Sequence, residues 1–182
     1  MIFRETKLKG AYIIELEPVE DKRGYFARTF CVEEFRRHGI NFEVLQCNIS
    51  FNKKRGTLRG MHYQVAPHEE AKLVSCISGA IYDVIVDLRA GSPTYCQWLG
   101  VRLAACSPGS TGYKMLYVPK GFAHGFQTLE DNSVVYYQMS EFYHPESASG
   151  VRWNDPAFGI EWPEVERMVI SDKDSSYRNF SP

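Results

Sequence analysis

The chain has 182 residues, the usual length of one domain with one hydrophobic core, and we expect residues 1–182 to form a single domain. The 21 Lys and Arg residues nearly balance the 22 Asp and Glu residues, for a net charge of -1, so the sequence does not favour nucleic acid as a partner. A hydrophobic content of 44% and an aromatic content of 14% exclude a disordered chain and favour β structure.

Cysteine usage and apolar runs bear on the cellular compartment. The five cysteines are widely spaced and form no C-x-x-C pair, which argues against a disulfide framework and against a zinc knuckle. The N-terminal segment MIFRETKLKG holds no apolar run behind its charges, and Asp87 interrupts the apolar run at 84–88. The sequence therefore predicts neither a signal peptide nor a membrane span, and we expect a cytoplasmic protein with no membrane partner.

The predicted elements are mostly short strands, separated by Gly, Pro, Ser and Asn clusters at the spacing of an antiparallel sandwich or barrel. One short helix is predicted within 32–39, where Val32 and Phe35 lie three apart, two Glu precede two Arg, and Gly39 takes the place of a C-terminal cap. The C-terminal third is expected to be irregular, with a turn at Asp155. In chain order, the predicted strands cover residues 12–16, 42–51, 72–77, 80–89, 98–104, 115–118 and 134–139.

The densest group of polar side chains lies at residues 55–72 and comprises Arg59, His62, Gln64, His68, Glu69, Glu70 and Lys72. If residues 58–64 are extended, Gly60, His62 and Gln64 share one face, and Arg59 joins His62 only if Gly60 marks a bulge. Two neighbouring cations oppose a third positive charge on His62, which is the environment of a general base. A solvent-exposed hairpin with an ordinary surface histidine is the alternative.

A second polar segment, residues 117–124, ends in a tight turn that leads to His124. Its Pro-x-Gly-x-x-His pattern matches part of the second cupin motif, in which the histidine often binds a metal. Here His62 and His124, even with Glu69 or Glu70, fall short of the three or more well-placed ligands that a zinc or iron site needs. We therefore expect no metal, and a hydrogen-bonded core histidine is the alternative for His124.

Aromatic and charged side chains outside these two segments could also contribute to a site. A regular strand through 134–143 would place Tyr137 and Tyr143 on one face, as a proton donor and a stacking platform, although most barrel tyrosines only pack. In the DKRGYF turn, Arg23 could clamp a phosphate and Phe26 could support a base or ribose, or the turn could simply be solvated. The carboxylates of the SDKD segment could orient a distant imidazole.

Nine motifs in order, spread over residues 2–174, carry a resemblance to a known family. They are DKRGYF, QCNIS, RGTLRGMHYQ, KLV, AIYDVIVDLRAGSPTY, YVPKGFAHGF, YYQMSEFYHPES, VRWNDPAFGIEWP and SDKD. The series resembles the dTDP-4-dehydrorhamnose 3,5-epimerases, which are deoxysugar nucleotide epimerases. The resemblance implies an all-β fold, a cupin-type antiparallel jelly-roll barrel with one or two short helices, that works without a metal or an organic cofactor. It also implies a homodimer that exchanges N-terminal strands.

The resemblance assigns roles to residues of this chain. It makes His62 the base, Tyr137 the acid and Asp174 the partner of His62. Lys72 is assigned to the enolate oxygen, with Arg59 or His124 as alternatives for that role. Tyr143 is assigned to stacking on the nucleotide base. The other substrate-binding residues that it implies are Arg23, Phe26, Arg28, Gln46, Asn48, Arg59, Lys72, His124 and Lys173.

The implied reaction inverts C3 and C5 of dTDP-4-dehydro-6-deoxy-D-glucose to give dTDP-4-dehydro-L-rhamnose, because a C4 ketone acidifies the hydrogens on both neighbouring carbons. Arg28 and Ala148 stand where the family often carries acidic residues, so a related epimerase acting on one carbon or on another 4-keto-deoxysugar nucleotide is an alternative. A cupin binding module without catalysis is a further alternative, and the joint presence of His62, Tyr137 and Asp174 argues against it. A metal-dependent cupin dioxygenase is disfavoured by the missing ligand histidines.

Overall fold

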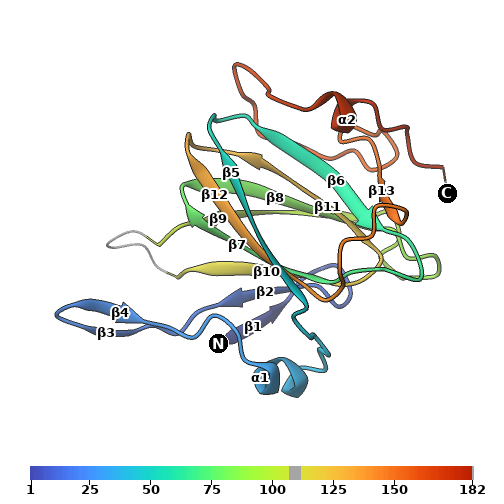
Figure 1. Cartoon of the computed structure of the whole chain (residues 1–182). Coiled ribbons are helices and arrows are strands. Elements are labelled where there is room, and N and C mark those ends of the chain that lie inside the picture. Colours follow the sequence, from blue (N-terminus) through green and yellow to red (C-terminus); the bar gives the residue numbers. More distant parts are fainter. Residues whose placement is uncertain (107–111, 182) are drawn as a thin grey trace.

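The computed structural model describes residues 1–106 and 112–181, and nearly all of the regular structure in these ranges is β-strand (Figure 1). The two helices are short, α1 at Val32–Arg37 and α2 at Asp172–Ser175, and within the described ranges no helix is long and apolar enough to cross a membrane. The strands are β1 (Ile2–Glu5), β2 (Tyr12–Glu15), β3 (Val19–Asp21), β4 (Gly24–Phe26), β5 (Gln46–Asn52), β6 (Leu58–Gln64), β7 (Lys72–Ser78), β8 (Ala80–Asp87), β9 (Trp98–Ala104), β10 (Lys114–Val118), β11 (Phe122–Thr128), β12 (Ser133–Met139) and β13 (Ala148–Gly150).

Two antiparallel sheets face each other and enclose the main core (Figure 1). The six-stranded sheet has the order β1-β2-β10-β7-β12-β5, and the five-stranded sheet has the order β13-β6-β11-β8-β9. Most neighbours in each sheet are far apart in the sequence, as in a jelly roll. Side chains from both sheets, such as Val74, Ile85, Leu116 and Phe126, fill the space between them. The predicted all-β jelly-roll barrel with short helices is confirmed.

The C-terminal segment covers the outer face of the five-stranded sheet. Along β8, Ile81 and Ile85 point into the main core, whereas Val84 and Val86 pack in a second cluster with Phe158 of the C-terminal segment. Both faces of β8 are therefore buried, which explains why its sequence has no polar face. Complete burial of each such side chain contributes roughly 1.5 to 3 kcal/mol, so this layer is a substantial part of the stability.

Helix α1 confirms the predicted helix and explains one wrong strand boundary. Gly39 follows the helix with a φ angle of +73°, in the left-handed region that glycine adopts without strain. Phe35 of α1 stacks on Phe42, and both belong to an apolar cluster that also includes residues of the six-stranded sheet. Because Phe42 is held in this cluster, the strand predicted at 42–51 begins only at Gln46.

The other predicted strands are confirmed to within two residues at each end. A regular strand through 134–143 is wrong, because β12 ends at Met139 and Tyr143 lies in the loop that follows. The short strands β1, β3 and β13 have no clear pattern in the sequence. The irregular C-terminal region is confirmed only beyond β13, where α2 is the one regular element in the described residues, because β11, β12 and β13 also lie in the last third of the chain.

Asp87, at the end of β8, organises the turn that follows. Its carboxylate is fully buried and accepts two hydrogen bonds of 2.8 Å from the Arg89 guanidinium. The hydroxyl groups of Ser92 and Thr94 also donate to it, at 2.6 and 2.7 Å. Burial alone would raise the pKa of Asp87, but these donors outweigh burial and lower the pKa to about 2. The carboxylate is therefore charged and paired at neutral pH.

We expect Asp87→Asn to destabilise the protein at neutral pH by on the order of 1 to 3 kcal/mol, because buried donors lose a charged acceptor. The pKa in the folded protein lies below the ordinary value, so the contribution of the carboxylate is complete above about pH 4 and is lost as the pH falls toward about 2. Urea unfolding over this range should show the stability difference between wild type and variant shrinking below about pH 4. A difference that stays constant would contradict this assignment.

Candidate active site

A pocket of about 350 Å³ opens at the end of the barrel where β6 and β12 end and β5 and β7 begin. Both sheets contribute walls, and residues of β13 and of the C-terminal segment complete the rim. The lining residues are Gln46, Asn48, His62, Tyr63, Gln64, Glu70, Lys72, Tyr137, Met139, Tyr143, Ala148, Ser149, Lys173 and Tyr177. The pocket thus gathers seven of the residues predicted from the sequence, namely Gln46, Asn48, His62, Lys72, Tyr137, Tyr143 and Lys173.

Strand β5 turns its polar side chains inward. Gln46 and Asn48 line the pocket, and the Gln46 amide donates to Asn48 Oδ1 at 3.2 Å. Ile49 and Phe51 point outward and are 65% and 51% exposed. This reverses the usual alternation, in which the apolar residues of a strand face the core. The reversal gives the pocket a wall of amide groups and leaves the outer face of β5 apolar.

The backbone of β6 is bulged between Arg59 and His62. His124 of β11 pairs with His62, and Phe126 pairs with Arg59, so three residue steps on β6 span two on β11. Gly60 lies in this bulge with a φ angle of +134°, and a Cβ atom there would come within 2.5 Å of the β11 backbone. In a regular strand, residues three apart point to opposite faces. The bulge on which the Arg59 prediction depends is therefore present, but Arg59 is not among the residues that line the pocket, and its Nε atom donates to Asn52 Oδ1 at 2.8 Å. Contact of Arg59 with substrate stays a prediction.

His62 is paired with Asp174 of α2. The His62 Nε2 atom lies 2.8 Å from Asp174 Oδ1, and Asp174 Oδ2 accepts a hydrogen bond from the Gly60 backbone N–H at 3.1 Å. The cap residue Ser171 accepts a hydrogen bond from the Asp174 backbone N–H at 3.1 Å, which holds this turn of α2. Because the carboxylate is an acceptor, the proton of a neutral imidazole lies on Nε2, and Nδ1 is left to accept another.

Asp174 remains ionised at neutral pH. Burial, which leaves the residue 5% exposed, would raise its pKa, but the hydrogen bond and charge of His62 and the Gly60 N–H outweigh burial. The net effect is a pKa below the ordinary value. The charged carboxylate orients the His62 ring through their hydrogen bond, and a carboxylate in this position can stabilise an imidazolium.

Tyr137 stands on the wall opposite His62, because β12 and β6 belong to opposite sheets. Burial raises the pKa of Tyr137, and the positive charge of Arg59 lowers it in part. The phenol therefore keeps its proton at neutral pH and is a competent donor. The site has a proton acceptor on one wall and a proton donor on the other.

Lys72 supplies a buried positive charge to the same pocket. Its Nζ atom lies 3.0 Å from Glu70 Oε1 and donates to the His62 carbonyl oxygen at 3.3 Å. Glu70 Oε2 accepts a hydrogen bond from the Gln64 backbone N–H at 3.0 Å. From the sequence, Glu70 is named in the polar group at 55–72 and as a doubtful metal ligand, and its two-residue spacing from Lys72 is the signal that could have paired them.

His124 forms a second histidine–carboxylate pair, with its Nε2 atom 2.8 Å from Asp83 Oδ1. Both residues are buried, and His124 is not among the side chains that line the pocket. This is the position of a hydrogen-bonded core histidine, which the sequence offers as an alternative. Contact of His124 with substrate stays a prediction.

Three predicted substrate-binding residues lie away from the pocket of their own chain. Arg23 is in the β3–β4 turn, where its guanidinium pairs with Asp21, and Phe26 at the end of β4 is 76% exposed. Arg28 pairs with Glu34 of α1 at 3.1 Å. The β3–β4 hairpin projects from the barrel on the side away from α2 (Figure 1). Within one chain, these residues do not join the site.

Two tyrosines in the pocket were not predicted from the sequence. Tyr177 lies three residues beyond Asp174, and its ring centroid is 5.9 Å from that of His62. Gly150 makes room for it, because a Cβ atom there would come within 2.4 Å of the Tyr177 ring. Tyr63 follows His62 on β6 and also lines the pocket. The spacing from Asp174 is the signal that could have identified Tyr177.

An imidazole–carboxylate pair, a protonated phenol on the opposite wall and a buried ammonium group form a site for moving protons at carbon through an enolate. The fold and site define a cupin-type isomerase. The chain belongs to the dTDP-4-dehydrorhamnose 3,5-epimerase family, whose family model matches residues 5–181.

Individual proteins match over nearly their whole length. The dTDP-4-dehydrorhamnose 3,5-epimerase of Methanothermobacter thermautotrophicus is 44% identical, over 99% of this chain and 93% of that protein. The crystal structure of the Elizabethkingia anophelis enzyme of the same name superposes with a TM-score of 0.92 at 40% identity, covering 99% of this chain and 96% of that one.

Two further solved structures contain sugar nucleotides. The dTDP-6-deoxy-D-glucose-3,5-epimerase of Legionella pneumophila, in complex with dTDP-4-keto-L-rhamnose, has a TM-score of 0.89 at 36% identity, covering 98% of this chain and 92% of that one. A 3'-monoepimerase from Streptomyces bikiniensis, in complex with dTDP-quinovose, has a TM-score of 0.85 at 34% identity, covering 96% and 85%.

We expect Glu70→Gln to destabilise the protein by roughly 3 kcal/mol, because removal of one partner from a buried ion pair leaves Lys72 with an uncompensated charge. Urea unfolding at neutral pH measures the change. Glu69→Gln is the matched control, since the neighbouring Glu69 is only partly buried and does not line the pocket, and its effect should stay within about 0.5 kcal/mol. Equal effects of the two substitutions would count against a special role for Glu70.

Proposed function

We propose that the protein inverts C3 and C5 of dTDP-4-dehydro-6-deoxy-D-glucose and so forms dTDP-4-dehydro-L-rhamnose. The observation that carries this proposal is the placement of the His62–Asp174 pair and of Tyr137 on opposite walls of one pocket. Inversion at carbon needs a proton removed from one face and another delivered to the opposite face. The Legionella relative whose structure contains dTDP-4-keto-L-rhamnose supports the choice of sugar nucleotide.

In the proposed reaction, His62 takes the proton from C3, and the electron pair of the broken C–H bond moves onto the C4 oxygen as an enolate. Lys72, whose side chain is 8% exposed, stabilises the negative charge that develops there. Tyr137 then gives its proton to C3 from the opposite face, and the enolate returns to the ketone. His62 and Tyr137 regain their starting protonation through solvent, and the same steps repeat at C5. The scheme uses no metal and no organic cofactor.

The rest of the pocket supplies groups for the nucleotide. Gln46 and Asn48 offer amide donors and acceptors, and Lys173 offers a cation for the diphosphate. Tyr143 is 55% exposed at the rim, where its ring is free to stack on the base. These assignments follow the family resemblance residue by residue.

We expect wild-type protein, incubated with the 4-keto-6-deoxyglucose nucleotide in deuterated water, to place deuterium at both C3 and C5. His62→Ala should reduce the exchange by a factor of about 10² to 10⁴, the usual contribution of a positioned base. Tyr137→Phe should permit proton removal but slow the completed inversion. NMR of the recovered sugar measures label and configuration separately.

Tyr136→Phe is the matched control for Tyr137→Phe, because neighbouring residues on a strand point to opposite faces of the sheet. Full inversion by the Tyr137 variant would refute its role as the acid. Label at one carbon would instead indicate a single-carbon epimerase, as the Streptomyces bikiniensis monoepimerase is named. Ala148 lines the pocket and departs from the common family pattern, so it is the first position to consider in that case. Binding without any exchange would indicate a non-catalytic module.

We also propose that the active form is a homodimer in which the β3–β4 hairpin of each chain completes the pocket of the other. Arg23 and Phe26 lie on this exposed hairpin, apart from the pocket of their own chain. A second chain is the simplest way to bring them to a nucleotide. This arrangement would also cover Phe26, whose exposure is unusual for a large aromatic side chain.

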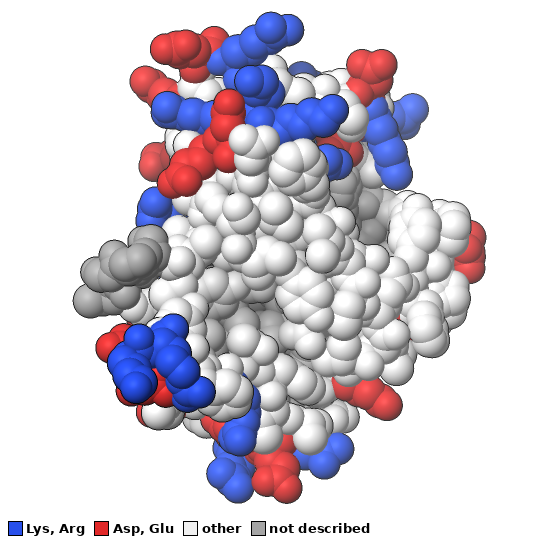
Figure 2. Space-filling view, turned by 60° about the vertical axis from the view of Figure 1, so that its left-hand side comes forward, with Lys and Arg blue, Asp and Glu red and all other residues white. Residues whose placement is uncertain are grey.

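The outer face of the six-stranded sheet offers a surface for such a dimer. Figure 2 shows a broad face without charged side chains, bordered by charged residues. Large apolar side chains of the six-stranded sheet are exposed, including Ile49, Phe51 and Ile77. The residues of β5, β7 and β12 that alternate outward are uncharged, namely Cys47, Ile49, Phe51, Leu73, Ser75, Ile77, Val134, Tyr136 and Gln138.

We expect an inactive His62→Ala chain and an impaired Arg23→Ala chain to restore each other when they are co-refolded. Random assortment gives heterodimers in which one of the two sites has both residues, so roughly a quarter of wild-type activity should return. Co-refolding His62→Ala with Tyr137→Phe is the control, because both residues belong to one chain and no intact site forms. If the His62 and Arg23 variants also fail to restore activity, the hairpin does not act across the dimer. Cytoplasmic location stays a prediction.

A further inference from the structure

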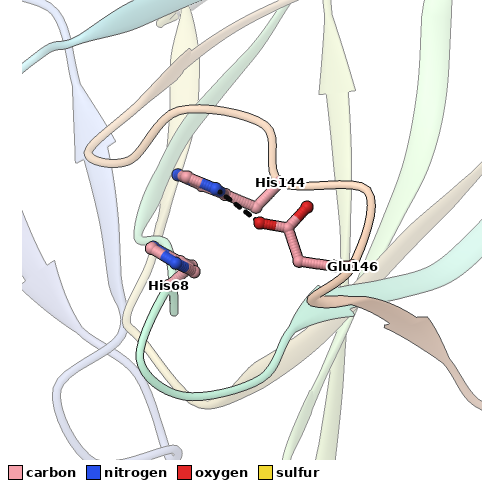
Figure 3. Close-up of side chains that lie close together, drawn as sticks. All are labelled: His68, His144 and Glu146. Atoms are coloured by element: carbon pink, nitrogen blue, oxygen red, sulfur yellow. Dashed lines mark hydrogen bonds and ion pairs between the residues drawn. The ribbon is translucent and has the colours of Figure 1, made fainter.

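A cluster of two histidines and a glutamate lies at the rim of the barrel, apart from His62 and His124. His68, in the loop between β6 and β7, and His144, in the loop between β12 and β13, stack with ring centroids 3.5 Å apart and planes 10° from parallel (Figure 3). Glu146 Oε1 lies 3.1 Å from His144 Nδ1. One ligand atom from each of the three side chains lies within 4.8 Å of the other two.

The buried side-chain amide of Gln64 bridges the two loops next to the histidines. Gln64 donates to the carbonyl oxygens of His68, at 2.7 Å, and of Phe142, at 3.1 Å, and its Oε1 atom accepts a hydrogen bond from the His144 N–H at 2.7 Å. The backbones of both histidines are therefore fixed before any ligand arrives. Preorganisation of this kind lowers the entropy cost of binding.

The side chains at this cluster are available to a cation. Among the described residues, no hydrogen bond or ion pair holds the His68 ring, so its nitrogen atoms are not committed to another partner. Two carboxylates flank His144, from Glu146 and from Glu141, whose Oε1 atom lies 3.8 Å from His144 Nε2. The cluster combines two imidazole donors with negative charge.

We propose that His68, His144 and Glu146 form a binding site for a divalent transition metal of the zinc class. Two imidazoles and a carboxylate suit Zn²⁺, whereas Ca²⁺ and Mg²⁺ prefer oxygen ligands alone. Zinc bonds of about 2.0 to 2.2 Å require the three ligand atoms to approach one another and the rings to turn from their parallel stack. Glu146 is 67% exposed in its side chain, so it is free to make that adjustment. Water completes the coordination.

The metal would join two loops that border the pocket. Tyr143 precedes His144, lines the pocket, and donates its backbone N–H to Gln46 Oε1 at 3.1 Å. Occupancy of the site would thus restrain the segment that carries Tyr143. This site is separate from the proposed proton-transfer groups and does not depend on the proposed function. The prediction of no metal considered a site built on His62 and His124, whereas the present proposal concerns other residues.

The test is a titration of the full chain with zinc chloride, followed by NMR of the imidazole nitrogens and by thermal unfolding. The chain has five histidines, so each ring signal can be assigned by substitution. We expect saturable shifts of the His68 and His144 signals with one zinc ion per chain, and a higher Tm in the presence of zinc. His68→Ala and His144→Ala should each weaken binding at least about tenfold, and Glu146→Gln should weaken it with little change in the apo fold.

His38→Ala is the matched control, because His38 stacks on Phe3 near α1 and lies outside the cluster. Zinc binding should be unchanged in this variant. Shifts confined to His62 or His124 would place the metal in the pocket and overturn the proposal. Binding that moves no imidazole signal, as ligation by cysteine thiolates would do, would also overturn it. So would a zinc-dependent rise in Tm that survives the His68→Ala and His144→Ala double substitution.

Discussion

The hydrogen bond between His62 and Asp174 is the contact on which the arrangement of this molecule depends. It joins β6 to a four-residue helix near the C-terminus, so the chain between them must bring α2 back over the five-stranded sheet. The apolar layer that holds this return path buries the second face of β8. Gly60 contributes at the same point, because its bulge presents the backbone N–H that binds the other oxygen of Asp174. Packing of the C-terminal segment and orientation of the His62 ring therefore depend on each other.

Two buried charged groups at the pocket, Asp174 and Lys72, each have a specific partner. Asp174 accepts hydrogen bonds from His62 and from the Gly60 N–H, and Lys72 is paired with Glu70. These pairs explain how a protein of net charge -1 holds several ionised groups in one cavity without a basic surface. Tyr137 is treated differently, since burial keeps its phenol neutral and therefore able to donate a proton. The proposed acid and base roles follow from environment as much as from residue type.

Two features connect the pocket to the outside of the barrel. Strand β5 presents amides to the pocket and apolar side chains to the surface, so the strand that would bind the nucleotide also offers an interface. Gln64 ties the two rim loops together while lining the pocket, and the His68–His144 stack rests on those loops. The polar pocket and the surfaces around it are built from the same strand ends. A structural change in the rim loops can therefore reach the pocket directly through Gln64.

Local patterns in the amino-acid sequence were sufficient for the elements that form from neighbouring residues. Alternation of apolar and polar residues predicted most strands, and the Gly39 cap predicted the end of α1. Because residues three apart on a strand point to opposite faces, a bulge at Gly60 was the condition for Arg59 to share a face with His62. The ordered motifs also pointed to the family and to His62 and Tyr137.

The three-dimensional fold was needed to establish which distant groups meet. These contacts are Tyr177 beside His62 and the His68–His144 stack. They are set by strand register and loop closure between segments far apart or irregular in the chain, and neither follows from periodicity. The role proposed for the exposed β3–β4 hairpin depends on a second chain, and no pattern within one sequence can position that chain.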